Sequence, residues 1–261
     1  MKRITLIMVC FVVIMLGTNA NADPYLMVYD GGGIGGIQTA MSEMGFTVVT
    51  DYILKGPGDT ISETELASVN ALIVGWNAGT GDMSGLDADV LDAGITGNIL
   101  ITGHDADWHV VNGMGGTTGP LSDAVDAAAT LFLSQAIDFA QEKGGTGLVA
   151  LADFLTAFDY LPDSWGITAT PGLSGDELIE ITVAGYTSGV YDGLAGSNMS
   201  PWVNSYHNEF TDWDPRFEVF ENHYSIDPVP ITIGYVVPVP TALLLGLLGL
   251  SVAGVKLRKF A

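Results

Sequence analysis

The sequence predicts a single α/β domain built on a mostly parallel sheet, with helices on both faces. Short, continuous apolar runs alternate with helix-like segments through the middle of the chain. Strands buried on both faces read as continuous apolar runs, whereas strands with one solvated face alternate apolar and polar residues. Residues 23–236, which lie between two unusual ends, are long enough to form one hydrophobic core.

The predicted strands are short apolar or β-branched runs. The first five cover residues 25–29, 46–50, 71–75, 98–102 and 148–152. After Asp153 the pattern changes, because residues 177–183 alternate apolar and polar side chains. Such alternation is typical of an antiparallel or edge strand. Two late strands are expected at residues 217–220 and 231–235.

Helices are predicted between these strands. One predicted helix ends near residue 44, and the others cover residues 62–67, 88–93 and 122–143. Ser62 and Glu65 match the capping-box pattern, in which the two side chains bind each other's backbone amides. The longest helix is mostly apolar and therefore largely buried. Gly144 is placed to end it, as glycine commonly does after a helix.

The first 22 residues have the parts of a secretory signal peptide. Two basic residues precede an apolar run at residues 4–16, and an Ala-x-Ala site ends at Ala22. The apolar run is shorter than the ~20 residues that span a bilayer. We therefore expect signal peptidase to cleave between Ala22 and Asp23. Cys10, the only cysteine, lies in this segment, so the mature chain has no disulfide, thiol nucleophile or thiolate metal site.

The expected exported domain is strongly acidic. Residues 23–236 hold all 30 acidic residues and only three basic ones, Lys55, Lys143 and Arg216, for a formal charge of −27. Nucleic acid is excluded as a partner, because binding phosphate requires lysine and arginine. Close contact with anionic lipid head groups is disfavoured for the same reason. The acidity is typical of solubility outside the cell.

The C-terminal segment, residues 237–261, has three parts. These are the proline motif Val237-Pro238-Val239-Pro240, an apolar run at residues 241–255, and the basic residues Lys256, Arg258 and Lys259. As a hydrophobic helix the run would be about 22 Å long. It spans the ~30 Å hydrocarbon core only with flanking residues. The basic end favours the cytoplasm.

These parts resemble the PEP-CTERM protein-sorting signal, with Val239 where the named motif has glutamate. The resemblance implies export, a transient anchor in the inner membrane of a Gram-negative bacterium, and cleavage near the proline motif by an exosortase-type transpeptidase. Such proteins are typical of bacteria that make exopolysaccharide. The final location would be the cell surface, the extracellular matrix or the medium.

A glycine-rich loop follows the first predicted strand. Gly31, Gly33 and Gly36 match G-x-G-x-x-G, and Asp51 lies 20 residues past the first glycine. This is the spacing of a dinucleotide-binding fingerprint. A run of glycines matches many patterns, and an exported protein does not ordinarily meet free NAD. We interpret the loop as a flexible turn and expect no cofactor.

Candidate site residues cluster after the predicted strand at 98–102. They are His104, Asp105, Asp107 and His109, and a more distant partner is His207. Sites in open α/β sheets lie at the carboxyl ends of strands, and histidine and aspartate are residue types that commonly bind metal ions. Their spacing matches no zinc motif, so no metal is assigned. The alternative is a polar loop in which an aspartate caps the next helix.

Two further groups have structural and functional interpretations. His207 and Glu209 could form an acid/base pair, or lie in a loop whose aromatic residues pack on the sheet. The four aspartates of residues 82–92 could bind calcium, although the EF-hand pattern is missing, or mark a solvated helix start. They are Asp82, Asp87, Asp89 and Asp92.

The strand order, residues 98–109 and residues 200–210 resemble the class I glutamine amidotransferase-like fold, a flavodoxin-like α/β architecture, over residues 25–235. Members carry a cysteine at a strand-to-helix elbow. Here the elbow reads Thr102-Gly103-His104, so the resemblance implies a divergent or ligand-binding site and no glutaminase chemistry. His104 would mark the nucleophile position, with His207 near it.

Our leading hypothesis is an exported envelope or exopolysaccharide-matrix protein with a non-catalytic or ligand-binding domain. One alternative is a secreted metal-dependent hydrolase that uses the His104, Asp107, His109 and His207 region. Another is a carbohydrate-binding matrix protein, whose sugar-stacking residues would be Trp108, Trp202 and Trp213.

Overall fold

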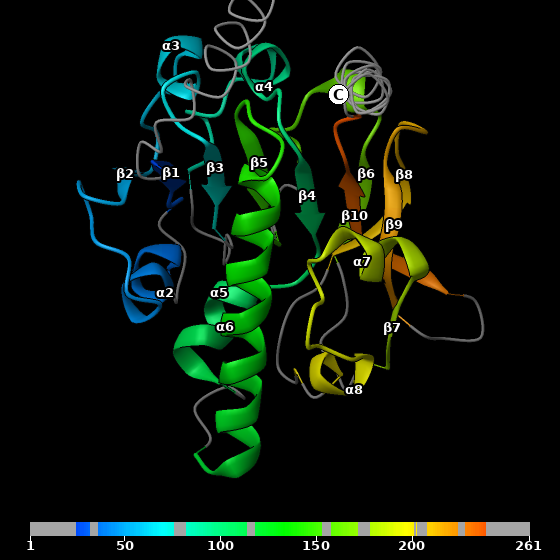
Figure 1. Cartoon of the computed structure of the whole chain (residues 1–261). Coiled ribbons are helices and arrows are strands. Elements are labelled where there is room, and N and C mark those ends of the chain that lie inside the picture. The colour runs from blue at the N-terminus through cyan, green and yellow to red at the C-terminus, as the bar shows by residue number, and fades with distance from the viewer. Residues whose placement is uncertain are drawn as a thin grey trace, which may run out of the picture.

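A computed structural model describes most of the predicted domain. The described residues are 25–31, 36–75, 82–113, 118–152, 158–171, 178–200, 202, 208–223 and 228–238. They form an α/β fold around an eight-stranded mixed sheet (Figure 1). The strand order is β2-β1-β3-β5-β4-β10-β9-β7, and β6 pairs with β8 in a separate two-stranded sheet.

Five consecutive strands run parallel, and three antiparallel strands extend the sheet at one side. The parallel strands are β1 (Leu26–Tyr29), β2 (Tyr52–Lys55), β3 (Ala71–Val74), β4 (Ile99–Thr102) and β5 (Gly147–Ala150). The antiparallel strands are β7 (Ile179–Ile181), β9 (Glu218–His223) and β10 (Val229–Tyr235). The small sheet contains β6 (Thr168–Pro171) and β8 (Asn208–Asp212).

Seven α-helices and one 3₁₀ turn lie in the described residues. They are α2 (Ile37–Glu43), α3 (Glu63–Leu66), α4 (Ala88–Gly94), α5 (Ala106–Asn112), α6 (Pro120–Gln141), α7 (Val183–Ser188), α8 (Gly196–Met199) and η1 (Asp163–Trp165). The long α6 runs along the sheet, beside α5 (Figure 1). The predicted helix at 122–143 therefore exists, displaced by two residues at each end.

The core lies on both faces of the sheet. In β1, Leu26 and Val28 belong to a buried cluster that includes residues of α2, α5 and α6. Met27 and Tyr29 belong to a second cluster that includes residues of α3 and α4. All four side chains are at most 1% exposed. This two-sided burial explains why the strand reads as an unbroken apolar run.

The strand predicted at residues 46–50 was wrong. Val48 makes only an isolated bridge to Tyr52, and the regular strand β2 begins at Tyr52. Val49 adopts φ 73° and is 78% exposed. The side chain of Asp51 accepts a hydrogen bond from the Thr47 amide (2.6 Å), so the segment closes into a turn. Local turn chemistry overrode the strand preference of the β-branched residues.

The terminal predictions fall largely on residues that the structure does not describe. The cleavage site at Ala22 and Asp23 lies outside the described residues, and so does the predicted hydrophobic helix at 241–255. The same holds for Val239, Pro240, Lys256, Arg258 and Lys259. In the described part of the chain, no helix combines the length and the apolar character needed to cross a membrane.

Candidate functional site

The turn after β4, which we call the elbow (residues 102–109), holds the predicted site residues. His104, Asp105, Asp107 and His109 all lie here, and each is at most 1% exposed. They lie at the carboxyl edge of the sheet, the edge at which β1, β3, β4 and β5 end. The structure places these four residues directly after β4. Their complete burial was not foreseen.

Gly103 explains the tight path of the elbow. Its amide donates to the Ile231 carbonyl (2.6 Å), and its carbonyl accepts from the Asn208 amide (3.1 Å). A Cβ atom at this position would lie 2.0 Å from the Asn208 carbonyl oxygen. Only glycine permits the backbones of the elbow, β10 and β8 to approach this closely. The elbow is therefore fixed by backbone contacts to two later strands.

His104 faces a buried carboxylate that sequence reasoning missed. Its Nε2 lies 3.0 Å from Oε2 of Glu221, on β9, and both side chains are 0% exposed. The same oxygen accepts hydrogen bonds from the Tyr191 hydroxyl (3.0 Å) and the Thr232 hydroxyl (2.8 Å). Three donor groups thus converge on one carboxylate oxygen, which compensates part of the cost of burying a charge.

The threonine hydroxyls close a ring of hydrogen bonds around the elbow. Thr232 gives its only hydrogen to Glu221, so Thr102 must be the donor in the 2.9 Å contact between the two hydroxyls. Thr102 in turn accepts from the backbone amide of His104 (3.1 Å). The ring therefore runs from the His104 backbone through both hydroxyls to Glu221, which faces the His104 imidazole. It ties the backbone and side chain of His104 to the same carboxylate.

The electrostatics of this cluster favour an ionised Glu221. Burial raises the pKa of Glu221, but the nearby charge of His104 and the hydrogen bonds from Thr232 and Tyr191 outweigh it, so the pKa is below its usual value. The pKa of Tyr191 is raised well above 10, first by burial and then by the charge of Glu221. Tyr191 therefore stays a neutral donor.

His109 and Asp105 form a second buried pair within the elbow. His109 Nε2 lies 3.3 Å from an Asp105 oxygen, at i,i+4 spacing. The other ring nitrogen, Nδ1, lies 2.6 Å from the Gly113 carbonyl oxygen. A carbonyl only accepts, so Nδ1 carries a hydrogen and the orientation of the ring is fixed. Both histidines are thus engaged with groups of their own chain.

Trp202 packs against both histidine rings. Its ring centroid lies 5.1 Å from that of His104 and 5.0 Å from that of His109. Trp202 is 1% exposed, so it packs in the core and presents no face for stacking a sugar in this structure. Trp108 and Trp213, the other two tryptophans of the carbohydrate hypothesis, are half-buried.

Several other candidates have structural roles or lie outside the described residues. His207 is not described, so its predicted proximity to His104 stays a prediction. Asp87 caps α4 by accepting from the amides of Asp89 and Val90, which confirms the helix-start interpretation. Asp92 accepts hydrogen bonds from the side chains of Ser164 and Trp165. Among the described residues no group of three or more histidines, cysteines and acids could hold a metal.

The dinucleotide interpretation does not fit the described geometry. An acid that binds the ribose follows the second strand of such a unit, at the carboxyl edge. Asp51 instead precedes β2 and closes the turn before it. The middle of the glycine loop, residues 32–35, lies outside the described residues. The position of Asp51 therefore argues against the dinucleotide interpretation.

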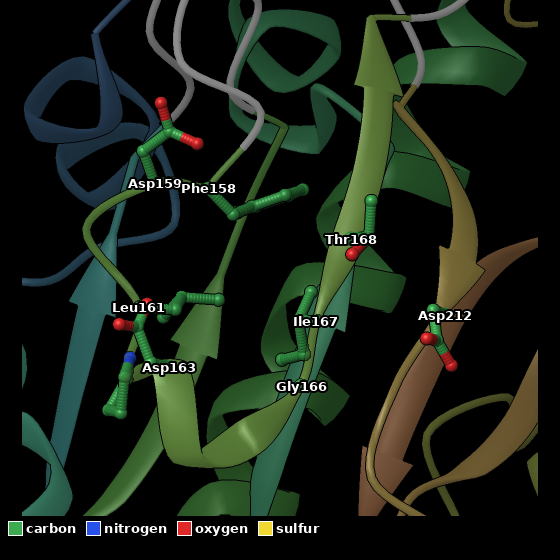
Figure 2. A pocket seen from close by; sticks show the side chains of 9 residues that line it. Phe158, Asp159, Leu161, Asp163, Gly166, Ile167, Thr168 and Asp212 are labelled. Carbon is green, nitrogen blue, oxygen red and sulfur yellow. The ribbon is translucent and has the colours of Figure 1, made fainter.

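A surface cavity of about 560 Å³ lies beside β6 and β8 (Figure 2), and no residue of the elbow lines it. It is lined by Phe158, Asp159, Leu161, Pro162, Asp163, Gly166, Ile167, Thr168 and Asp212. Its three aspartates are exposed, and Figure 2 shows Asp159 and Asp212 on opposite sides of it. Sequence reasoning did not anticipate this cavity, because its lining comes from loops and strand ends.

Comparisons with protein-family models, curated proteins and solved structures found no match. The functional argument therefore depends on the residues themselves. At the elbow and on the elements packed against it, His104, Glu221 and Tyr191 supply an imidazole, a carboxylate and a phenol, the groups of acid/base chemistry. In this structure they are buried and directed at one another.

Proposed function

We propose that the chain is an exported envelope or exopolysaccharide-matrix protein that a membrane enzyme releases from a C-terminal anchor. The carrying observation is the arrangement of charge along the chain. Residues 23–236 have a formal charge of −27, whereas both end segments are apolar and carry only basic charges. Basic ends favour the cytoplasmic side, so the acidic domain between them lies outside.

We infer the partners of the protein from its two end segments, residues 1–22 and 237–261. Signal peptidase removes residues 1–22, and an exosortase-type transpeptidase recognises the proline motif that begins at Val237. The inner membrane holds residues 241–255 until cleavage. The released domain then resides at the cell surface, in the extracellular polysaccharide or in the medium.

We propose a non-catalytic or ligand-binding role for the domain itself. The support is the buried elbow, where His104 pairs with Glu221 and His109 with Asp105. Opening the His104–Glu221 pair would leave a buried carboxylate without its charged partner, which costs about 3–5 kcal/mol. A hydrolase that used Nε2 of His104 as a metal ligand would first have to open this pair. The elbow is better suited to holding strands together than to receiving a substrate.

The finer fold assignment, a glutamine amidotransferase-like branch of the flavodoxin-like folds, also stays a proposal. The order β2-β1-β3 and the glycine at the strand-to-helix elbow support it. A flavodoxin-like sheet has the order 2-1-3-4-5. Here β5 lies between β3 and β4, so the chain returns through α5 and α6 to an inner position.

The test is the identity of the mature ends in the producing cell. Cell fractions are analysed by mass spectrometry of the intact protein at successive times. We expect the N-terminus at Asp23, a membrane-bound precursor that contains Lys256, and a released product that ends near Pro240. A matched variant, Pro238→Ala with Pro240→Ala, should accumulate as precursor. Released protein that still ends at Ala261 would refute the proposal.

A further inference from the structure

Both ends of the described domain lie at the same edge of the sheet, opposite the elbow. We call it the amino edge, where β1, β3, β4 and β5 begin and β10 ends (Figure 1). The register across the sheet links Leu26 to Ala71, Ala71 to Gly147, Leu148 to Ile99, and Ile99 to Tyr235. Four strand spacings separate Leu26 from Tyr235, which is about 19 Å. A chain anchored at both ends would therefore turn this edge to the membrane.

A buried asparagine holds the start of the sorting segment at this edge. The Asn98 side chain is 0% exposed, and its Oδ1 accepts a hydrogen bond from the backbone amide of Val237 (2.9 Å). Its Nδ2 donates to the Phe139 carbonyl of α6 (2.8 Å). One amide side chain thus connects the first residue of the proline motif to the longest helix of the domain.

The base of this contact is closely packed. The Asn98 carbonyl accepts from the Leu148 amide (2.9 Å). A Cβ atom on Gly147 would lie 2.0 Å from the Ala140 carbonyl oxygen and 2.8 Å from that of Asn98. Asn98 is therefore fixed between β5 and α6, and the outer partner, Val237, is the part of the contact that can leave.

The motif also follows the domain without a spacer. Tyr235 is the last residue of β10, and only Val236, which is 42% exposed, separates it from Val237. A peptidase must surround several residues on either side of the bond it cuts and must reach their backbone groups. Here the amide of Val237 is already committed to Asn98, because each residue has only one such donor.

We propose that Asn98 acts as a latch on the sorting segment, residues 237–261. Its hydrogen bond keeps Val237 against the folded domain and slows cleavage by the membrane enzyme until this bond opens. This inference rests on the proposed function. A typical hydrogen bond contributes a net ~0.5–1.5 kcal/mol. Loss of this bond should therefore raise the fraction of chains in which Val237 is detached from the domain roughly 2- to 10-fold.

Two variants of the full-length chain test the latch in the producing cell. Asn98→Ala removes both hydrogen bonds of the side chain. Asn98→Leu keeps the volume of the side chain but neither accepts from Val237 nor donates to Phe139, so it remains informative if the cavity left by Asn98→Ala unfolds the domain. We expect both to lose the C-terminal segment about 2- to 10-fold faster than wild type in a pulse-chase experiment. The matched control is Val236→Ala, which should be processed at the wild-type rate.

Amide hydrogen exchange of the purified full-length chain separates the two proposals. We expect the Val237 amide to exchange slowly in wild type and quickly in Asn98→Ala. If wild type is processed and both variants are processed at the same rate as wild type, the latch is refuted and the function stands. If wild type is never processed, the proposed function and the latch on cleavage both fail, and the exchange of the Val237 amide decides only whether Asn98 holds this residue.

Discussion

At the scale of single residues, the two carboxylate oxygens of Glu221 differ in their contacts. Oε2 faces three donor groups, whereas Oε1 is buried without a hydrogen-bond partner among the described residues. The ionised form is held by the charge of His104 and by two hydroxyl groups. A carboxylate this dependent on its partners should make the fold sensitive to acid.

The first prediction concerns this acid sensitivity. The pKa of Glu221 is lower in the folded chain than its ordinary value of 4.5. Its ionisation therefore stabilises the native state fully above about pH 4.5, and this stabilisation is lost as the pH falls through the folded pKa. Glu221→Gln should lower the free energy of unfolding at pH 7 by about 3–5 kcal/mol. It should also flatten the pH dependence between pH 3 and 5.

Urea unfolding at several pH values measures both effects. The matched control is Glu218→Gln, an exposed carboxylate on the same strand, which should unfold like wild type. A Glu221→Gln variant with wild-type stability at pH 7 would show that His104 is not held by this pair.

The elbow shows how far sequence reasoning reaches at the residue scale. Four polar residues that follow one apolar strand could be placed at the carboxyl edge of the sheet, because sites in open α/β sheets lie at this edge. Glu221 could not be found, because the strand predicted there stopped at residue 220. Its partner Tyr191 comes from a turn 30 residues earlier, and only tertiary packing brings the two together.

At the scale of elements, strands buried on both faces could be predicted and short connections could not. The runs at β1, β3, β4 and β5 have no solvated face, so composition alone marks them. The turn before β2 was misread because its β-branched residues imitate a strand. The position of β5 between β3 and β4 depends on how α6 packs, and no local pattern encodes it.

The second prediction concerns α3, whose capping box was expected and is present. The Ser62 amide donates to Glu65 (2.9 Å), which also accepts from Lys55 of β2 (2.6 Å). These contacts, led by that of Lys55, lower the pKa of Glu65 to about 2. Glu65→Ala should reduce the free energy of unfolding by about 0.5–1.5 kcal/mol in denaturant titrations, the net contribution of a typical hydrogen bond. Glu63→Ala, in the same helix, serves as the charge-matched control, and an equal loss there would argue against the box.

At the scale of the whole molecule, the dominant feature is charge. The full chain has a formal charge of −22, and its acidic residues all lie within residues 23–236. Few cations balance them, so most carboxylates repel one another across the surface. Net charge of this size favours solubility but destabilises the compact state through self-repulsion.

The third prediction is that salt stabilises this protein. The Debye length falls from ~10 Å at 0.1 M salt to ~3 Å at 1 M, which screens repulsion between exposed carboxylates. The few surface ion pairs, such as Lys55 with Glu65, lose little, because exposed pairs contribute only about 0–1 kcal/mol. Sodium chloride should therefore raise the Tm, by about 2–4 °C for each 1 kcal/mol gained. Sodium sulfate also strengthens apolar burial, so a Tm that rises with sulfate and not with chloride would contradict the repulsion argument. Urea replaces guanidinium as denaturant in these measurements, because guanidinium is itself a screening salt.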